Sequence, residues 1–243
     1  MILLIDQGNS ALKWCCYHDN SFTKSVVGEL NELVDFAKSN DKSITDIYIS
    51  CVKNQKQVSL ISSTFKQNNI CKPLRIATTS ANFGSLTNGY HQFEKLGVDR
   101  WLAMIAAWQK LQSGFIVVDA GSALTLDIVD NTGQHIGGHI IPGLSMQIKL
   151  LITDTDGIAV NSNNKAQAYI PGHSTTEAVL SGCLTNLCCY IDKMYQCYGE
   201  AHTLPLFLTG GDAVHLTAGL TIKHQLDNKL VLEGLYYLLN STD

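Results

Sequence analysis

Short apolar runs rich in β-branched residues recur along the chain, a pattern that predicts buried β-strands. They lie at 2–5, 47–52, 74–77, 115–119, 124–129, 136–141 and 206–209. Apolar positions spaced three and four apart predict helices at about 29–39, 55–68, 99–112, 175–198 and 228–240. Strands come first in each half and helices follow, so we expect an α/β fold.

The two halves of the chain share an outline. MILLIDQGNS and FIVVDAGSAL each consist of an apolar run, then Asp-x-Gly, then a small polar residue. Each is followed by a further strand-like run, WCCYH or TLDIVD. We therefore predict two similar subdomains, residues 1–114 and 115–243, whose acids Asp6 and Asp119 face one cleft.

Composition narrows the class of protein. The 243 residues are 45% hydrophobic, enough for a sizeable core, and the net charge of −4 is spread out. Without a basic stripe or polybasic helix, we expect neither nucleic acid nor membrane as a partner. MILLID lacks a basic leader, and the eight cysteines include no Cys-x-x-Cys, so we expect a cytoplasmic protein whose cysteines are mostly small buried side chains.

The first Asp-x-Gly turn has the residues of a phosphate-binding hairpin. Gly8 allows a tight turn, and backbone N–H groups of residues 8 to 10 can point at phosphate oxygens. Asp6 can hold Mg²⁺ through water, and Lys13 can add a positive charge near the phosphates. A hairpin without any ligand also accounts for one such motif taken alone.

Two further strand-end turns favour the nucleotide interpretation. Asp119 ends an apolar run and is followed by Gly121 and Ser122, and Gly210-Gly211-Asp212 follows LPLFLT and precedes a short helix. Glycine lets a backbone approach a ligand closely. Asp127 shares a strand face with Thr125, and its role stays open.

A third carboxylate, Asp99, begins a predicted helix beside Arg100. Asp99 can accept a proton from an alcohol, and the planar fork of Arg100 can bind a carboxylate. Alternatively, Asp99 caps the helix and Arg100 is a surface charge. Tyr90, in the preceding turn, serves either loop packing or substrate contact.

Taken together, several ordered motifs over nearly the full length resemble type III pantothenate kinase, in the superfamily that includes acetate kinase, sugar kinases and actin. They are DQGNSALKW at 6–14, NGYHQFEKLGVDRW at 88–101, DAGSALTLDIVD at 119–130, GGHIIPGL at 137–144, TTEAVLSG at 175–182 and LTGGDA at 208–213. The resemblance implies two ribonuclease H-like (actin-like ATPase) subdomains with a nucleotide cleft between them.

The resemblance also implies an activity: ATP-dependent phosphorylation of pantothenate at its 4′-hydroxyl, the first step of coenzyme A synthesis. It implies Mg²⁺, a monovalent cation (K⁺ or NH₄⁺) and a homodimer with a shared active site. Two alternatives stay open: a kinase for another small hydroxylated substrate, and a non-catalytic nucleotide-binding regulatory protein.

Site residues follow from the resemblance by position. The ATP-binding segment corresponds to Asp6, Gln7, Gly8, Asn9, Ser10, Ala11, Leu12 and Lys13, with Ser122 as a further ATP contact. The pantothenate site corresponds to Tyr90, Gly97, Val98, Asp99 and Arg100, and Thr175 matches a threonine that contacts the substrate across the dimer. Asp99 takes the place of the catalytic base, and Asp119 that of the monovalent-cation ligand.

Four departures from the family pattern keep the chemical groups. Ser10 and Ser122 replace more usual threonines, Phe93 stands where proline is common, and CVKN at 51–54 lacks the usual proline. The predicted helix at 175–198 has an apolar seam that suits either core or a subunit interface. We expect Thr175, Thr176 and Glu177 to cap its start.

Overall fold

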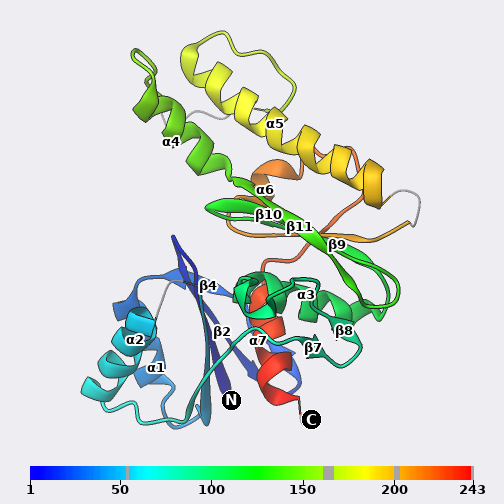
Figure 1. Cartoon of the computed structure of the whole chain (residues 1–243). Helices are drawn as coiled ribbons and strands as arrows, with labels where there is room; N and C mark the ends of the chain where they lie inside the picture. Colours follow the sequence, from blue (N-terminus) through cyan, green and yellow to red (C-terminus); the bar gives the residue numbers. More distant parts are fainter. Residues whose placement is uncertain (53–54, 161–166, 200–202, 242–243) are drawn as a thin grey trace. The chain divides into compact units, whose positions relative to one another are not determined.

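The computed structural model describes residues 1–52, 55–160, 167–199 and 203–241 (Figure 1). It divides into two compact units, Met1–Gln112 with Lys229–Asp243, and Ser113–Asn228. The division falls close to the predicted boundary at 114, but residues 229–243 lie with the first unit rather than the second. In the described residues, no helix is long and apolar enough to cross a membrane.

The first unit is a twisted sheet between two pairs of helices (Figure 1). Its strand order is β3-β2-β1-β5-β6, with β4 also paired to β2. The strands are β1 (Ile2–Gln7), β2 (Leu12–His18), β3 (Ser21–Phe22), β4 (Val26–Gly28), β5 (Asp46–Cys51) and β6 (Leu74–Ile76), and a small hairpin pairs β7 (Asn82–Phe83) with β8 (Leu86–Thr87). The helices are α1 (Leu30–Ser39), α2 (Gln55–Gln67), η1 (Phe93–Lys95), α3 (Val98–Leu111) and α7 (Leu230–Asn240).

Strand alternation decides which helices cover which face of this sheet. Leu3 and Ile5 of β1 pack with Leu33 of α1 and Phe65 of α2 in one core cluster. The residues between them, such as Leu4, point to the other face, where α7 packs on β1 and α3 packs on β5. Both faces of β1 are therefore buried, which explains why MILLI is an unbroken apolar run.

The second unit repeats the strand order of the first. Its sheet runs β11-β10-β9-β12-β13, with β9, β10 and β11 antiparallel and β9, β12 and β13 parallel. In the first unit, β1, β2 and β3 are likewise antiparallel and β1, β5 and β6 parallel. This order and orientation are those of the ribonuclease H-like fold, so the prediction of two similar α/β halves is confirmed.

The described elements of the second unit form its sheet and the helices that pack on it. They are β9 (Phe115–Ala120), β10 (Ala123–Val129), β11 (His135–Pro142), α4 (Leu144–Asp154), α5 (Thr175–Tyr198), β12 (Leu206–Thr209), α6 (Ala213–Leu216) and β13 (Gln225–Leu226). Ile116, Val118, Leu124 and Leu126 form one core with Leu187 of α5. The sequence pattern did not predict α4. Its sequence, LSMQIKLLITD, contains β-branched residues and polar residues that obscure the helical spacing of its apolar positions.

The cysteines are partly as expected. Cys15, Cys16, Cys183 and Cys188 are buried free thiols, but Cys71, Cys189 and Cys197 are exposed. Burial raises the pKa of the Cys15 thiol to about 12 and that of Cys16 to about 11, so both stay neutral and act as apolar side chains.

The C-terminal helix belongs to the first unit because of close contacts with α3. Gly234 of α7 lies so close to the Leu102 carbonyl of α3 that an added methyl group would overlap it. Nearby, the Lys110 ammonium of α3 lies 2.5 Å from the carboxylate of Glu233, whose side chain is only 8% exposed. The two helices are thus joined by a glycine contact and an ion pair that is largely buried.

Replacing Glu233 with Gln should lower the free energy of unfolding by about 2 kcal/mol, and Tm by about 4–8 °C. The loss is smaller than for a fully buried pair because the Lys110 side chain is 26% exposed. Asp41→Asn is the matched control: it removes an ion pair with Lys72 whose Asp41 side chain is 41% exposed, and should cost less than about 0.5 kcal/mol. Equal losses in thermal unfolding would contradict the expectation.

Candidate functional site

The predicted phosphate-binding hairpin is the turn between β1 and β2. In the antiparallel ladder Asp6 lies directly opposite Lys13, and in the parallel ladder it lies beside Ser50 of β5. Directly paired residues share a sheet face. By alternation with Leu4, this is the face on which α3 and α7 pack. Asp6 is 8% exposed and Ser50 fully buried, so the acid sits at the end of a buried strand, as predicted.

Within this turn, one backbone group has a different role from the predicted one. The Gly8 N–H donates to the Ala11 carbonyl at 3.0 Å and closes the turn. It therefore cannot also point at a phosphate in this conformation. Asn9 and Ser10 form the exposed tip, and the Gln7 side-chain amide donates to the Gly8 carbonyl at 3.0 Å. A phosphate approaching this hairpin would meet residues 9 and 10 first.

The second unit repeats this acidic strand end. Asp119 is paired with Thr125 of β10 and Thr209 of β12, so the three side chains share a sheet face. The Gly121 N–H closes the following turn on the Ala123 carbonyl at 3.1 Å. The turn is one residue shorter than its counterpart, because GSA replaces GNSA. Ser122 lies at its tip, and its carbonyl accepts the Gly143 N–H at 3.1 Å.

Glycines from two distant turns pack closely against the strand end that carries Asp119 and the turn after it. Gly210 has a φ of +100°, and an added methyl group there would overlap the Ala120 carbonyl and lie 2.5 Å from Asp119 Oδ1. Gly143 lies against the carbonyls of Gly121 and Ser122 with no room for a side chain. The Asp212 N–H then donates to the Ala120 carbonyl at 2.9 Å. Gly143 of the GGHIIPG motif and Gly210 of the LTGGDA motif therefore allow close backbone packing around one strand end.

Asp99 and Arg100 occupy the first turn of α3, as predicted. Gly97 is the N-cap residue and makes no side-chain cap, and Val98 is the first helical residue. The Asp99 carboxylate accepts the Arg100 N–H at 2.9 Å and folds back over Gly97, where an added methyl would lie 2.6 Å from it. Gly97 thus leaves the space that the carboxylate occupies. Arg100 is 5% exposed, which excludes a surface-charge role.

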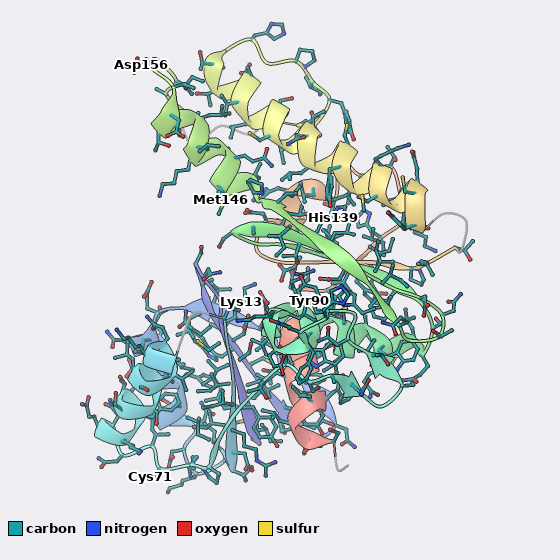
Figure 2. The ribbon with its side chains drawn as sticks, in the orientation of Figure 1. Lys13, Cys71, Tyr90, His139, Met146 and Asp156 are labelled. Carbon is teal, nitrogen blue, oxygen red and sulfur yellow. The ribbon has the colours of Figure 1, made fainter. Side chains whose placement is uncertain are left out.

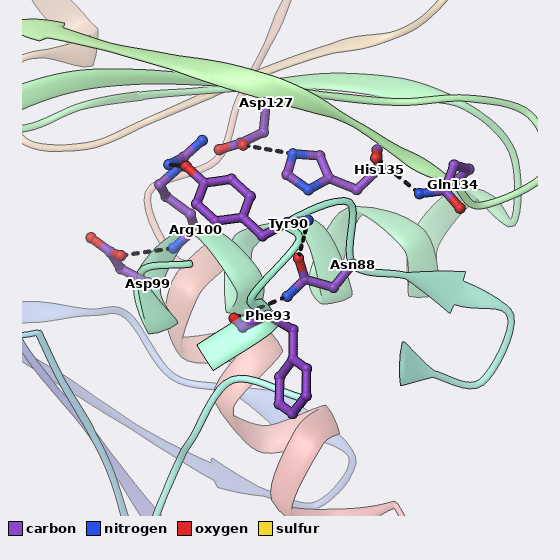
Figure 3. A network of polar contacts seen from close by, with 8 residues as sticks. All are labelled: Asn88, Tyr90, Phe93, Asp99, Arg100, Asp127, Gln134 and His135. Carbon is purple, nitrogen blue, oxygen red and sulfur yellow. Dashed lines mark hydrogen bonds and ion pairs between the residues drawn. The ribbon is translucent and has the colours of Figure 1, made fainter. Parts of the chain in front are cut away.

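Tyr90 contacts Arg100 directly (Figure 3). The Arg100 guanidinium donates to the Tyr90 hydroxyl at 2.7 Å and lies 5.5 Å from the centre of the Tyr90 ring. Both a hydrogen bond and a cation–π contact hold the fork in place. Phe93 opens η1, where the family more often has proline, and its carbonyl accepts the Asn88 amide at 3.4 Å. Lys53 and Asn54 of CVKN lie outside the described residues.

Thr175 begins α5 but does not cap it. The N-cap is Ser174, whose hydroxyl accepts the Glu177 N–H at 3.2 Å, and Glu177 in turn accepts the His173 N–H at 2.8 Å. The prediction that Thr175 and Thr176 cap the helix is wrong, because the capping position falls one residue earlier. Thr175 instead lines a pocket of about 540 Å³ between α4 and α5, with Gln147, Leu151 and Gly182.

Sequence reasoning missed a buried polar pair in the second unit. His135 Nε2 lies 3.0 Å from Asp127 Oδ1, and their side chains are 0% and 2% exposed (Figure 3). The pair joins β10 to β11 across the turn that Asp130 closes by accepting the N–H groups of Thr132 and Gln134. Asp127 shares its sheet face with Thr125 and therefore with Asp119. The turn sequence Asp-Asn-Thr-Gly at 130–133 was the sequence signal that could have predicted the pairing of these two strands.

A second histidine contact lies on the opposite face of the same sheet. His139 on β11 is paired with Leu126, a residue of the α5-side core, and its Nδ1 lies 2.7 Å from the Tyr190 hydroxyl of α5 (Figure 2). This contact ties the strand to the helix. His139 thus has a packing role, and the Asp119 face carries a different set of polar side chains.

Among the described residues, no group of three or more His, Cys, Asp or Glu side chains is arranged to hold a metal ion. Asp6 and Asp119 each offer one carboxylate at a strand end. Mg²⁺ is commonly bound by one or two carboxylates together with water and substrate phosphates. The donor set therefore suits a cation that arrives with a phosphorylated ligand better than a resident metal.

Two ribonuclease H-like units, each with an acid at the end of its first strand and a glycine turn after it, define the class of the acetate kinase, sugar kinase and actin superfamily. Residues 2–197 match the family described as type III pantothenate kinase. The chain belongs to this family.

Individual relatives agree with this assignment. The chain is 33% identical to the type III pantothenate kinase of Pseudomonas savastanoi pv. phaseolicola, over 97% of each chain. It is 32% identical to that of Teredinibacter turnerae, over 98% of each. Among solved structures, it resembles a conserved Baf family protein of Campylobacter jejuni with a TM-score of 0.62 and 21% identity, over 98% of this chain and 97% of the other. The last of these comparisons supports the fold alone.

Gly210→Ala should lower Tm by several degrees, because alanine at this positive φ costs about 1–3 kcal/mol and the methyl group would overlap the Ala120 carbonyl. Gly211→Ala is the matched control, since no atom lies within 4 Å of the added methyl. Thermal unfolding followed by circular dichroism separates the two variants. Equal Tm values would show that Gly210 is not needed for this turn.

Proposed function

We propose that this protein transfers the γ-phosphoryl group of ATP to the 4′-hydroxyl of pantothenate, the first step of coenzyme A synthesis. Membership of the type III pantothenate kinase family supports the reaction. The observation that carries it is the start of α3, where the buried Arg100 guanidinium is held by Tyr90 next to the Asp99 carboxylate. Such a site pairs a binding group for an acid with a proton acceptor for an alcohol.

Arg100 is proposed to bind the pantothenate carboxylate. A guanidinium presents parallel N–H donors that match the two oxygens of a carboxylate. At 5% exposure, the charge lies in an environment where an anionic partner is bound more strongly than in water. Tyr90 holds one side of the fork, which leaves less side-chain freedom to lose on binding. Gly97 and Val98 complete this site through their backbone.

Asp99 is proposed as the general base. Phosphoryl transfer proceeds through a loose transition state, so the attacking alcohol loses its proton late and a carboxylate suffices. The Asp99 carboxylate is fixed by the Arg100 N–H at 2.9 Å and lies over Gly97. A pantothenate molecule whose carboxylate is bound by Arg100 would then be oriented by a residue adjacent to the base. Positioning of this kind is a main source of kinase rate enhancement.

ATP is proposed to bind along the strand-end turns. In the first unit these residues are Asp6, Gln7, Gly8, Asn9, Ser10, Ala11, Leu12 and Lys13, and in the second Ser122. Lys13 shares a sheet face with Asp6 and can neutralise phosphate charge. Mg²⁺, when bound through water at Asp6, and K⁺ or NH₄⁺ at Asp119, would neutralise charge on the transferred group. We propose that the reaction takes place in the cytoplasm.

The protein is further proposed to act as a homodimer joined through the α4 side of the second unit. Met146 and Leu150, spaced one helical turn apart on α4, are 46% and 53% exposed. Figure 2 labels Met146 on this helix. Exposed apolar residues gathered on one helix face favour a protein partner. Thr175 lines a pocket whose other walls include Gln147 and Leu151 of the same helix α4. A second copy seated here would have Thr175 at the shared boundary.

Asp99→Asn should lower kcat by a factor of about 100 or more, because the amide cannot accept the proton, while the Kd for ATP stays within about twofold. ADP release in a coupled assay, with and without pantothenate, measures turnover, and calorimetry measures ATP binding. Glu94→Gln is the control and should behave as wild type, because Glu94 is an exposed carboxylate of η1. Activity of Asp99→Asn close to that of wild type would exclude the base role.

Leu150→Glu should shift sedimentation from dimer to monomer and abolish most activity, because a charge would enter an apolar interface. The matched control is Leu60→Glu on α2, which replaces a leucine of similar exposure, 49%, outside the proposed face. This control should remain dimeric and active. A wild-type protein that sediments as a fully active monomer would refute the shared site.

A further inference from the structure

A closed ring of hydrogen bonds links the loop before α3 to two adjacent residues of that helix. The Trp101 indole N–H donates to the Ser80 hydroxyl at 3.1 Å, and the Ser80 carbonyl accepts the Asn88 side-chain amide at 3.2 Å. Asn88 Oδ1 accepts the Tyr90 N–H at 3.0 Å, and the Tyr90 hydroxyl accepts from Arg100 at 2.7 Å. Because Arg100 and Trp101 are neighbours, the ring begins and ends on the same helical turn.

The Asn88 side chain both donates and accepts hydrogen bonds in this part of the chain (Figure 3). It follows the β7–β8 hairpin directly and is 8% exposed. Its side-chain amide nitrogen also donates to the Phe93 carbonyl at 3.4 Å, and its backbone N–H donates to the Ala81 carbonyl at 2.9 Å. One side chain thus joins the hairpin, the turn before Tyr90 and the start of η1.

The chemistry of these partners requires an amide. Two carbonyl oxygens, of Ser80 and Phe93, can only accept, and the Tyr90 N–H can only donate. Asparagine supplies two donors and one acceptor in this small volume. Aspartate has the same size but would place an oxygen against the two carbonyls, and alanine would leave buried polar groups without this partner.

We propose that Asn88 is a positioning residue for recognition of the acidic substrate. By fixing the Tyr90 backbone, it places the Tyr90 hydroxyl against Arg100 and so sets the direction of the guanidinium fork. This inference rests on the proposed function only in taking Arg100 as the group that binds the substrate carboxylate. Asn88 itself touches neither substrate nor the reacting atoms.

The test is a double-mutant cycle on pantothenate kinetics in the full-length protein. Asn88→Ala should raise the KM for pantothenate about tenfold, as expected for loss of about 1.4 kcal/mol of binding, with kcat and the KM for ATP within about threefold. Tyr90→Phe should raise the KM for pantothenate by a similar factor. In the Tyr90→Phe background, Asn88→Ala should add less than about twofold, because both changes act through the same hydroxyl.

Additive effects of the two substitutions, or an unchanged KM for pantothenate in Asn88→Ala, would overturn the proposal. Asn88→Asp supplies a second test if the alanine variant does not fold, since it keeps the acceptor for Tyr90 and loses both donations; a wild-type KM would likewise contradict the role. Asn82→Ala, an exposed asparagine of the same hairpin, is the matched control and should be unchanged.

A readout independent of turnover separates this inference from the proposed function. Amide hydrogen exchange in residues 88–97 should be faster in Asn88→Ala, while exchange in the buried part of α3 stays as in wild type. If the wild-type protein lacks pantothenate-dependent ADP release while Asn88→Ala still shows this faster exchange, the proposed function is refuted and the positioning role of Asn88 remains. Unchanged exchange in an active protein would refute the positioning role alone.

Discussion

Burial of a guanidinium at the start of α3 is the constraint on which the rest of the first unit's site depends. Removing a charged group from water costs several kcal/mol unless hydrogen bonds and charges compensate. Arg100, at 5% exposure, receives part of that compensation from the Tyr90 hydroxyl and ring. Tyr90 can supply it only because the loop before it is held in one conformation by Asn88 and Ser80. Side-chain hydrogen bonds thus fix the conformation of the segment between β6 and α3, as backbone hydrogen bonds fix that of a helix or strand.

The two units have the same sheet topology but differ in the residues around the acid that ends the first strand. In each, the first strand ends in an acid whose paired neighbours are short polar or charged residues: Lys13 and Ser50 around Asp6, Thr125 and Thr209 around Asp119. The difference lies in the surroundings of the acid. In the second copy, Gly210 from a distant turn packs against Ala120 and Asp119, and Gly143 packs against the carbonyls of the turn that follows. The first copy keeps a lysine in the place of a threonine.

Much of the fold followed from the sequence because its strongest signals are local. The apolar runs at 2–5, 115–119 and 206–209 lie within β1, β9 and β12, and the helical spacing at 175–198 coincides with α5. Helix α4 was missed because Ile148, Ile152 and Thr153 weaken its helical pattern and its outer side is apolar. The membership of α7 in the first unit depends on its contact with α3, which no local pattern encodes.

The residues of the candidate site also divide into those that a local sequence signal reveals and those that only the structure reveals. Asp6 and Asp119 could be singled out because each stands at the end of an apolar run before a glycine turn, and Asp99 and Arg100 because they open a predicted helix. Asn88 and the pair of Asp127 and His135 could not, because their importance comes from partners brought together by turns and registers. Sequence motifs identify candidate chemical groups more readily than the residues that hold them.

The return of α7 to the first unit has a consequence for synthesis on the ribosome. The second unit, Ser113–Asn228, is one continuous stretch and can complete its core as soon as it emerges. The first unit, although translated first, must wait for the last residues of the chain before α3 gains its partner helix. The earlier part of the protein is therefore the later one to mature, and a chain truncated before Lys229 would carry a finished second unit beside an incomplete first one.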